Sequence, residues 1–182
     1  PVGPTPRRRL SQVIEGLSRR PAGLERRGGR RSPAPEVPEG ATFGRRRHDG
    51  PHGGRDYCLY LPSDRHRSVR GVVLMLHGCT QSPEDFALGT RMNARAEEHG
   101  LVVVYPEQAR QHNPSLCWNW FRPGDQGRSG GEPALLAGLA AEVASEYGVP
   151  EGHVFVAGLS AGGAMAAILV QTHPEIFGAA GI

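Results

Sequence analysis

The sequence has no lysine: all 21 of its Lys and Arg positions are arginine. Its 182 residues are enough for one ordinary domain. It has no apolar run of about 18 residues, so no membrane-spanning helix is expected, and no secretory signal is visible after Pro1. The three cysteines, Cys58, Cys79 and Cys117, are too few and too widely spaced for a dense disulfide framework. No Cys-x-x-Cys pair or His/Cys cluster indicates a metal, so we expect no metal site.

Positive charge is concentrated at the N-terminus. Residues 1–50 hold 12 Arg against 5 acids, a net charge of +7, whereas residues 51–182 hold 9 Arg against 13 acids, a net charge of −4. Residues 1–50 have too few apolar side chains to offset the entropy of ordering them, so we expect a mostly disordered Arg/Pro/Gly-rich tail before a folded part over residues 51–182. No aromatic residues interleave with the Arg runs, and no nucleic-acid-reading motif accompanies them. A solvated tail is therefore favoured over nucleic-acid binding.

Segments with strand and helix patterns alternate after Arg55. Apolar runs predict buried strands, and amphipathic runs with N-cap and glycine signals predict helices. Ser82 is expected to cap the first helix, and Ser129 with Glu132 makes a capping-box pattern before the second. This order is typical of an α/β fold with a mostly parallel sheet and helices on both faces. The expected strands cover residues 55–62, 72–76, 101–105, 154–157 and 177–182, and the expected helices cover residues 83–99, 133–148 and 161–172.

One serine stands where a predicted strand turns into a predicted helix. Residues 158–162, GLSAG, match G-x-S-x-G with Ser160 at the centre. A serine at such a tight turn needs strained backbone angles and small neighbours two positions away, which Gly158 and Gly162 supply. The helix that follows directs its free N–H groups and positive dipole end at the serine. The pattern predicts a nucleophile, with a structural Gly/Ser turn as the alternative.

A second turn, HGCT, follows the buried strand over residues 72–76. In α/β-hydrolases the loop after this strand supplies one oxyanion donor, and the residue after the nucleophile supplies the other. The expected donors are the backbone N–H groups of Cys79, with Thr80 less favoured, and of Ala161. We expect His77 to brace this loop rather than to act as the base.

Four segments together resemble the polyhydroxybutyrate depolymerase family of esterases, which is related to feruloyl and acetylxylan esterases. They are HGCTQ (77–81), CWNWF (117–121), GEPALLAGL (131–139) and VFVAGLSAGGAMA (154–166). The resemblance covers roughly residues 55–182 and implies an α/β-hydrolase fold and ester hydrolysis with Ser160 as nucleophile. It also implies no metal or organic cofactor and a polyester or other ester as substrate. On the sequence features given above, neither nucleic acid nor a membrane is expected as a partner. Family members are often secreted, and others are intracellular.

Two of these segments hold cysteines and tryptophans with possible roles. If the protein is exported, a disulfide between Cys79 and Cys117 is expected, with two buried free thiols as the alternative. Cys58, inside a strand, is expected to be a core residue. A site for a hydrophobic polyester should have aromatic walls, for which Trp118 and Trp120 are candidates. Packing of their loop onto the sheet is an equal alternative.

The groups that should activate the serine are missing. The acid and then the histidine follow the nucleophile in α/β-hydrolases. The 22 residues after Ser160 include His173 and Glu175, which the helix would place about 18 Å from the serine. We therefore expect the triad Asp and His to lie beyond Ile182, and the chain to be a C-terminally truncated esterase with little activity of its own. The alternatives are a feruloyl or acetylxylan esterase, a serine peptidase, or an inactive fragment with a nucleic-acid-binding tail.

Overall fold

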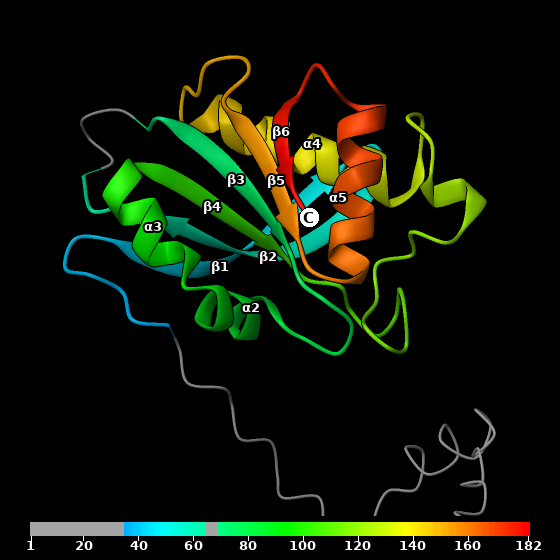
Figure 1. Ribbon diagram of the computed structural model, residues 1–182, viewed down its shortest axis with the longest axis horizontal. Helices are drawn as coiled ribbons and strands as arrows, with labels where there is room; N and C mark the ends of the chain where they lie inside the picture. The colour runs from blue at the N-terminus through cyan, green and yellow to red at the C-terminus, as the bar shows by residue number, and fades with distance from the viewer. Residues whose placement is uncertain (1–34, 65–68) are drawn as a thin grey trace, which may run out of the picture. The chain divides into compact units, whose positions relative to one another are not determined.

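A six-stranded sheet with the strand order β1-β2-β4-β3-β5-β6 forms the centre of the fold (Figure 1). The computed structural model describes residues 35–64 and 69–182, so the disorder expected for residues 1–34 lies outside the described part. β3, β4, β5 and β6 run parallel to one another, whereas β2 is antiparallel to both of its neighbours. The predicted α/β fold is therefore confirmed. The strands are β1 (Thr42–Gly50), β2 (Gly53–Leu61), β3 (Gly71–Leu76), β4 (Leu101–Pro106), β5 (Val154–Gly158) and β6 (Phe177–Gly181).

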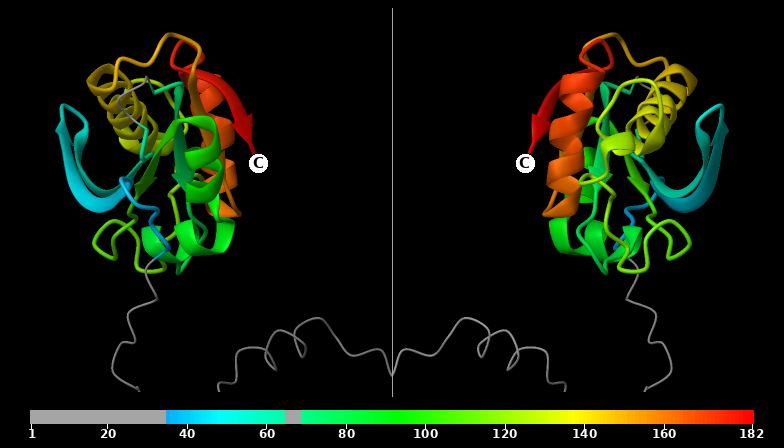
Figure 2. Two further views of the ribbon diagram at one scale, coloured as in Figure 1. Left: turned by 90° about the vertical axis from the view of Figure 1, so that its left-hand side faces the viewer. Right: turned by 90° about the vertical axis from the view of Figure 1, so that its right-hand side faces the viewer.

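Helices cover both faces of this sheet. α4 (Gly131–Glu146) and α5 (Ala161–Thr172) pack on one face, and α2 (Pro83–Thr90) and α3 (Met92–His99) pack on the other. The β1–β2 hairpin and β6 lie at opposite edges of the sheet (Figure 2). Within the described residues, no helix combines the length and the apolar character that crossing a bilayer requires.

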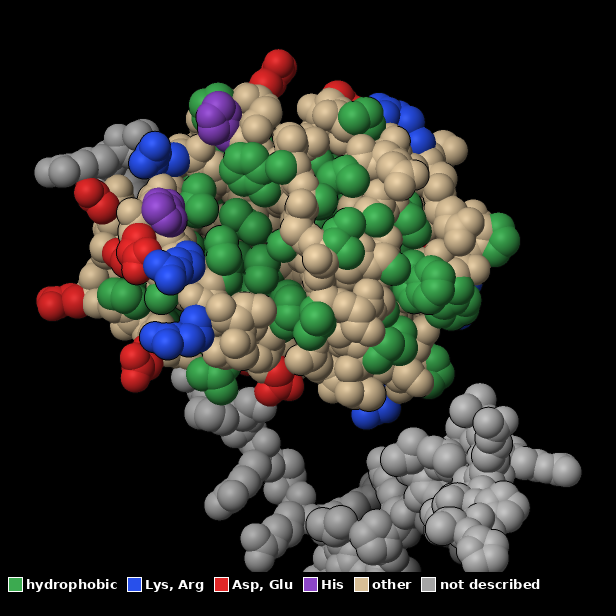
Figure 3. Space-filling model, in the orientation of Figure 1, with side chains coloured by type: hydrophobic (Ala, Val, Ile, Leu, Met, Phe, Trp, Pro, Cys, Tyr) green, Lys and Arg blue, Asp and Glu red, His purple; other side chains and the backbone are tan. Residues whose placement is uncertain are grey.

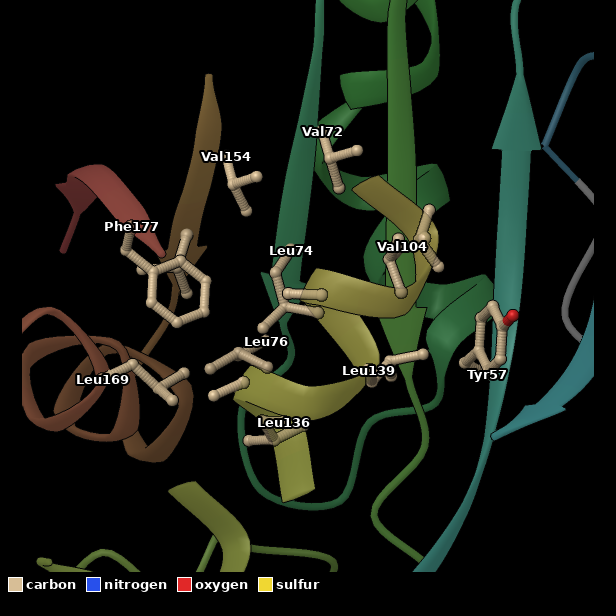
Figure 4. Packing of buried hydrophobic residues seen from close by; sticks show 14 of the residues in the cluster. Tyr57, Val72, Leu74, Leu76, Val104, Leu136, Leu139, Val154, Leu169 and Phe177 are labelled. Carbon is tan, nitrogen blue, oxygen red and sulfur yellow. The ribbon is translucent and has the colours of Figure 1, made fainter. Parts of the chain in front are cut away.

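Alternate side chains of the central strands enter two separate cores. Leu74 and Leu76 of β3 are fully buried against α4 and α5 (Figure 4). Val73 and Met75 of the same strand point to the opposite face, toward α2 and α3. Because both faces of β3 are covered, every one of its residues is buried, which explains its unbroken apolar sequence.

The folded part begins earlier than the sequence predicted. Residues 42–50, assigned to the disordered tail, form β1 and pair with β2 along their whole length. The three consecutive arginines of β1 form ion pairs with carboxylates, most of them far away in the sequence, so their charge is matched in the fold. The pairs are Arg45 with Glu84 and Glu107, Arg46 with Glu146, and Arg47 with Asp49 and Asp56. The boundary at residue 50 was therefore wrong.

The single helix expected over residues 83–99 is divided into α2 and α3 at Arg91. This residue has a left-handed backbone, with φ 54°, and its N–H donates to the Ala87 carbonyl. The Thr90 hydroxyl donates to the Phe86 carbonyl at 2.7 Å, a bond to the residue four positions earlier that weakens and bends helices. The start of α2 agrees with the prediction, since Ser82 caps it in a reciprocal capping box.

Arg91 provides a test of this helix break. Arg91→Gly removes the Cβ that disfavours a positive φ, so we expect the free energy of unfolding to rise by about 0.5–1 kcal/mol. The matched control is Arg95→Gly inside α3, which we expect to lower it by about the same amount. Urea unfolding of both variants checks the pair. Equal destabilisation by the two substitutions would contradict the left-handed assignment.

Candidate active site

The turn between β5 and α5 presents Ser160 to solvent. Its backbone has φ 56° and ψ −119°, a strained combination for a residue with a side chain. The two flanking glycines have no room for a side chain. A Cβ on Gly158 would lie 2.7 Å from the Gly163 nitrogen, and a Cβ on Gly162 would lie 2.7 Å from the His77 oxygen. The G-x-S-x-G pattern is therefore a steric requirement of this turn.

The loop after β3 lies against the same serine. A Cβ built on Gly78 would be 3.6 Å from the Ser160 Cβ, which is van der Waals contact, so Gly78 lies directly beside the serine side chain. Thr80, with φ 65°, is a β-branched residue in the left-handed region and marks a second strained position of the site. In the described residues, the backbone N–H groups of Cys79 and Ala161 donate to no acceptor. The oxyanion hole expected from these two groups stays a prediction, and their lack of an acceptor is compatible with it.

His77 is a structural part of this loop, as the sequence analysis expected. The side chain is fully buried, and its Nε2 accepts a hydrogen bond from the Gln108 N–H at 3.1 Å. Its Nδ1 lies 2.7 Å from the Gly78 carbonyl oxygen, so Nδ1 carries the proton. Burial lowers the pKa of His77, which keeps the imidazole neutral. Both ring nitrogens are thus occupied by the backbone.

A disulfide and a hydrogen bond connect the segment over residues 115–121 to the loop after β3. Cys79 and Cys117 form a disulfide, with their Cα atoms 4.2 Å apart. The Trp118 indole is fully buried and donates from Nε1 to the His77 carbonyl at 3.0 Å. Trp118 therefore packs inside the protein, and its assignment as a substrate wall was wrong. Trp120 is 43% exposed and retains that candidate role.

A buried polar network beneath this segment was missed by the sequence analysis. The sequence predicted that Glu132 forms a capping box with Ser129, but its carboxylate is buried inside the protein. The N-cap of α4 is Gly130, which makes no side-chain hydrogen bond. The carboxylate accepts from the N–H and the Nδ2 of Asn119 at 2.7 and 2.9 Å, and from the Gln108 Nε2 at 2.5 Å. The signal in the sequence was a glutamate inside an otherwise apolar helix face.

An exposed apolar region lies beside the site. Figure 3 shows apolar side chains across the face that carries α5 and β6. A hollow of about 350 Å³ lies between Trp120 and the outer side of α5, where Ala164 and Ile168 line it. The Phe121 ring packs edge-on against the Trp120 ring, with the ring centroids 5.9 Å apart. Leu159, the residue before the serine, is 58% exposed.

No base approaches the serine within the described part of the chain. There, the Ser160 hydroxyl forms no hydrogen bond with a histidine or a carboxylate. His173 and Glu175 follow the far end of α5, and Glu175 pairs with Arg128 at 2.8 Å. Residues 35–64 and 69–182 also contain no group of three His, Cys, Asp or Glu side chains placed to hold a metal ion.

The fold is similar to that of an esterase of known structure. An acetyl xylan esterase from Aspergillus awamori superposes with a TM-score of 0.68 at 25% sequence identity, over 76% of this chain and 50% of that chain. The fold and the turn around Ser160 define the chain as an α/β-hydrolase, as predicted.

Sequence similarity then identifies the family. Residues 55–182 match the family described as Esterase PHB depolymerase. A poly(3-hydroxyalkanoate) depolymerase C from Paucimonas lemoignei is 34% identical over 109 residues, which are 60% of this chain and 26% of the relative. A feruloyl esterase B from Neurospora crassa is 28% identical over 119 residues, which are 65% and 39%. The chain belongs to the PHB depolymerase esterase family, and the matched regions span less than half the length of these relatives.

The steric requirement at the serine turn is testable without an activity assay. Gly162→Ala forces a Cβ against the end of β3, and we expect it to lower the free energy of unfolding by about 2–3 kcal/mol. Gly89→Ala in α2 is the matched control, because a Cβ there meets no atom within 4 Å and should raise stability by about 0.5–1 kcal/mol. Urea unfolding compares the two. Similar stability of both variants would show that the turn is looser than described.

Proposed function

We propose that this chain carries the nucleophile and the oxyanion hole of a serine carboxylester hydrolase. The observation that carries the proposal is the position of Ser160, held at a strained φ between a helix N-terminus and the loop at Gly78. Its Oγ attacks the ester carbonyl carbon and loses its proton to a base, and the alcohol then leaves with a proton. Water hydrolyses the resulting acyl-enzyme to the free acid and restores the serine.

Two backbone donors would stabilise the transition state of each step. Within the described residues the N–H groups of Cys79 and Ala161 donate to no acceptor, which leaves them able to bind the oxyanion that forms when Oγ attacks. A donor of this kind contributes about 3 kcal/mol, because it is already oriented when the charge develops. The positive end of the α5 dipole acts in the same direction.

The base and its carboxylate are proposed to come from outside the described residues. A serine without a neighbouring base is a weak nucleophile at neutral pH. The residues after α5 offer only His173 and Glu175, which lie more than a helix length from Ser160. The 182 residues alone should therefore show little turnover.

A short-chain polyhydroxyalkanoate is the proposed substrate, with Trp120 and the hollow along α5 as the surface that receives it. The exposed apolar side chains of this region suit a polyester with few hydrogen-bonding groups. Similarity to a poly(3-hydroxyalkanoate) depolymerase supports this choice. A feruloyl or acetylxylan ester is the second candidate, supported by the other relative and by the superposed structure.

Export to an oxidising compartment is proposed from the disulfide. Cys79 and Cys117 are joined beside the candidate oxyanion loop, and such bonds persist outside the reducing cytosol.

The nucleophile is tested by Ser160→Ala in the protein expressed from its complete reading frame. We expect turnover of p-nitrophenyl butyrate to fall by at least about 10⁴-fold, because removing the nucleophile disables the whole triad. Ser145→Ala, an exposed serine of α4, is the matched control and should stay within twofold of the parent. Methyl ferulate and a 3-hydroxybutyrate oligomer, assayed on the same preparations, rank the two substrate classes.

Two results would overturn parts of this proposal. Activity that survives Ser160→Ala would remove Ser160 as the nucleophile. Ordinary turnover by residues 1–182 alone, abolished by Ser160→Ala, would show that the base lies within this chain.

A further inference from the structure

A single buried carboxylate holds together the two segments that support the candidate oxyanion loop. We propose that Glu132 is a positioning residue, which keeps the Cys79 N–H where it can bind the oxyanion; this inference rests on the proposed function. Glu132 is 6% exposed and belongs to α4, yet the hydrogen bonds and the ion pair of its side chain join it to the long loop between β4 and α4 and to β2. Two connected routes lead from it to the site.

The first route passes through Gln108. Its side-chain Nε2 donates to Glu132 at 2.5 Å and to the Cys117 carbonyl at 2.9 Å. Its backbone N–H donates to Nε2 of His77 at 3.1 Å, and Nδ1 of His77 bonds the Gly78 carbonyl. Three hydrogen bonds, through Gln108 and His77, thus connect the Glu132 carboxylate to the Gly78 carbonyl, which belongs to the peptide bond before Cys79.

The second route passes through Asn119, whose backbone and side chain both donate to Glu132. This holds the segment in which Trp118 donates to the His77 carbonyl and Cys117 forms the disulfide with Cys79. The Thr80 N–H also donates to this segment, at the Ser115 carbonyl. The loop at Cys79 therefore has little freedom of its own once residues 115–119 are fixed.

A carboxylate is required at this position because three donors and no acceptor face it from Asn119 and Gln108. The nearest cation, Arg55, has its Nη2 at 3.6 Å and balances the buried charge. A glutamine would have one acceptor oxygen, and its NH₂ group would face at least one of the donors. That donor would be left buried and unsatisfied, and the loop would shift to relieve it.

Glu132→Gln tests the assignment in the protein from the complete reading frame. We expect kcat on p-nitrophenyl butyrate to fall 10- to 100-fold with KM within about threefold, because a donor displaced by about 1 Å loses transition-state binding rather than substrate binding. Amide hydrogen exchange of residues 77–80 should become faster. The milder variant Asn119→Ala keeps the backbone donor and should reduce kcat three- to tenfold.

Asn93→Ala is the matched control. Asn93 is 4% exposed and accepts from the Tyr105 hydroxyl in the core on the opposite face of the sheet. We expect it to lower the unfolding temperature while leaving kcat and the exchange of residues 77–80 unchanged.

The outcomes separate the inference from the proposed function. If the parent protein has no esterase activity, the proposed function fails, and hydrogen exchange alone decides whether Glu132 positions the loop. If the parent protein is active and Ser160→Ala is inactive, the proposed function holds and the inference is tested by itself. It would be overturned if Glu132→Gln and Asn119→Ala both kept the parent's kcat and the parent's amide hydrogen exchange at residues 77–80. Loss of kcat in Asn93→Ala to the same degree would do so as well, because the effect would then be general destabilisation.

Discussion

The close approach of the first turn of α5 to the ends of β3 and β5 is the constraint on which the rest of the site depends. At Gly162 the helix touches the backbone of β3 where that strand ends, and at Gly158 the strand touches the helix. The chain can make this turn only if Ser160 accepts a positive φ. The same turn places the serine beside Gly78 and leaves the Ala161 N–H at the open end of the helix. One packing contact thereby sets the positions of the proposed nucleophile and of one proposed oxyanion donor.

The other proposed donor depends on a different kind of interaction. A disulfide, a buried histidine and a buried carboxylate network hold the loop that carries Cys79 in place. Buried polar networks of this kind are stable only when every member finds a partner, and they then define one geometry. The apolar core sets where the sheet and α5 lie, while the polar network sets the loop beside the serine.

The elements with strong local signals were predicted well. β3 and β5 agree with the prediction to within one residue at each end, because strands buried on both faces have unbroken apolar sequences, and α5 has the predicted bounds Ala161–Thr172. The turn at Ser160 was also recognised, because its tight packing requires glycine at the neighbouring positions 158 and 162. These features depend on residues close together in the chain.

Features that depend on distant partners were not predicted. β1 looked like a disordered tail because most of the carboxylates that pair with its arginines come from other parts of the chain. Glu132 fits a capping box equally well in sequence, and only the position of Asn119 in space shows that it faces inward. Trp118 and Trp120 are separated by a single residue, and packing alone decides that the first is buried and the second is exposed.

The most direct test of the account is a crystal structure of the protein from the complete reading frame after reaction with a dialkyl p-nitrophenyl phosphate. We predict phosphorus bonded to the Ser160 Oγ and a phosphoryl oxygen about 2.7–3.1 Å from the backbone nitrogens of Cys79 and Ala161. An unmodified Ser160, or a phosphoryl oxygen directed away from both nitrogens, would contradict it.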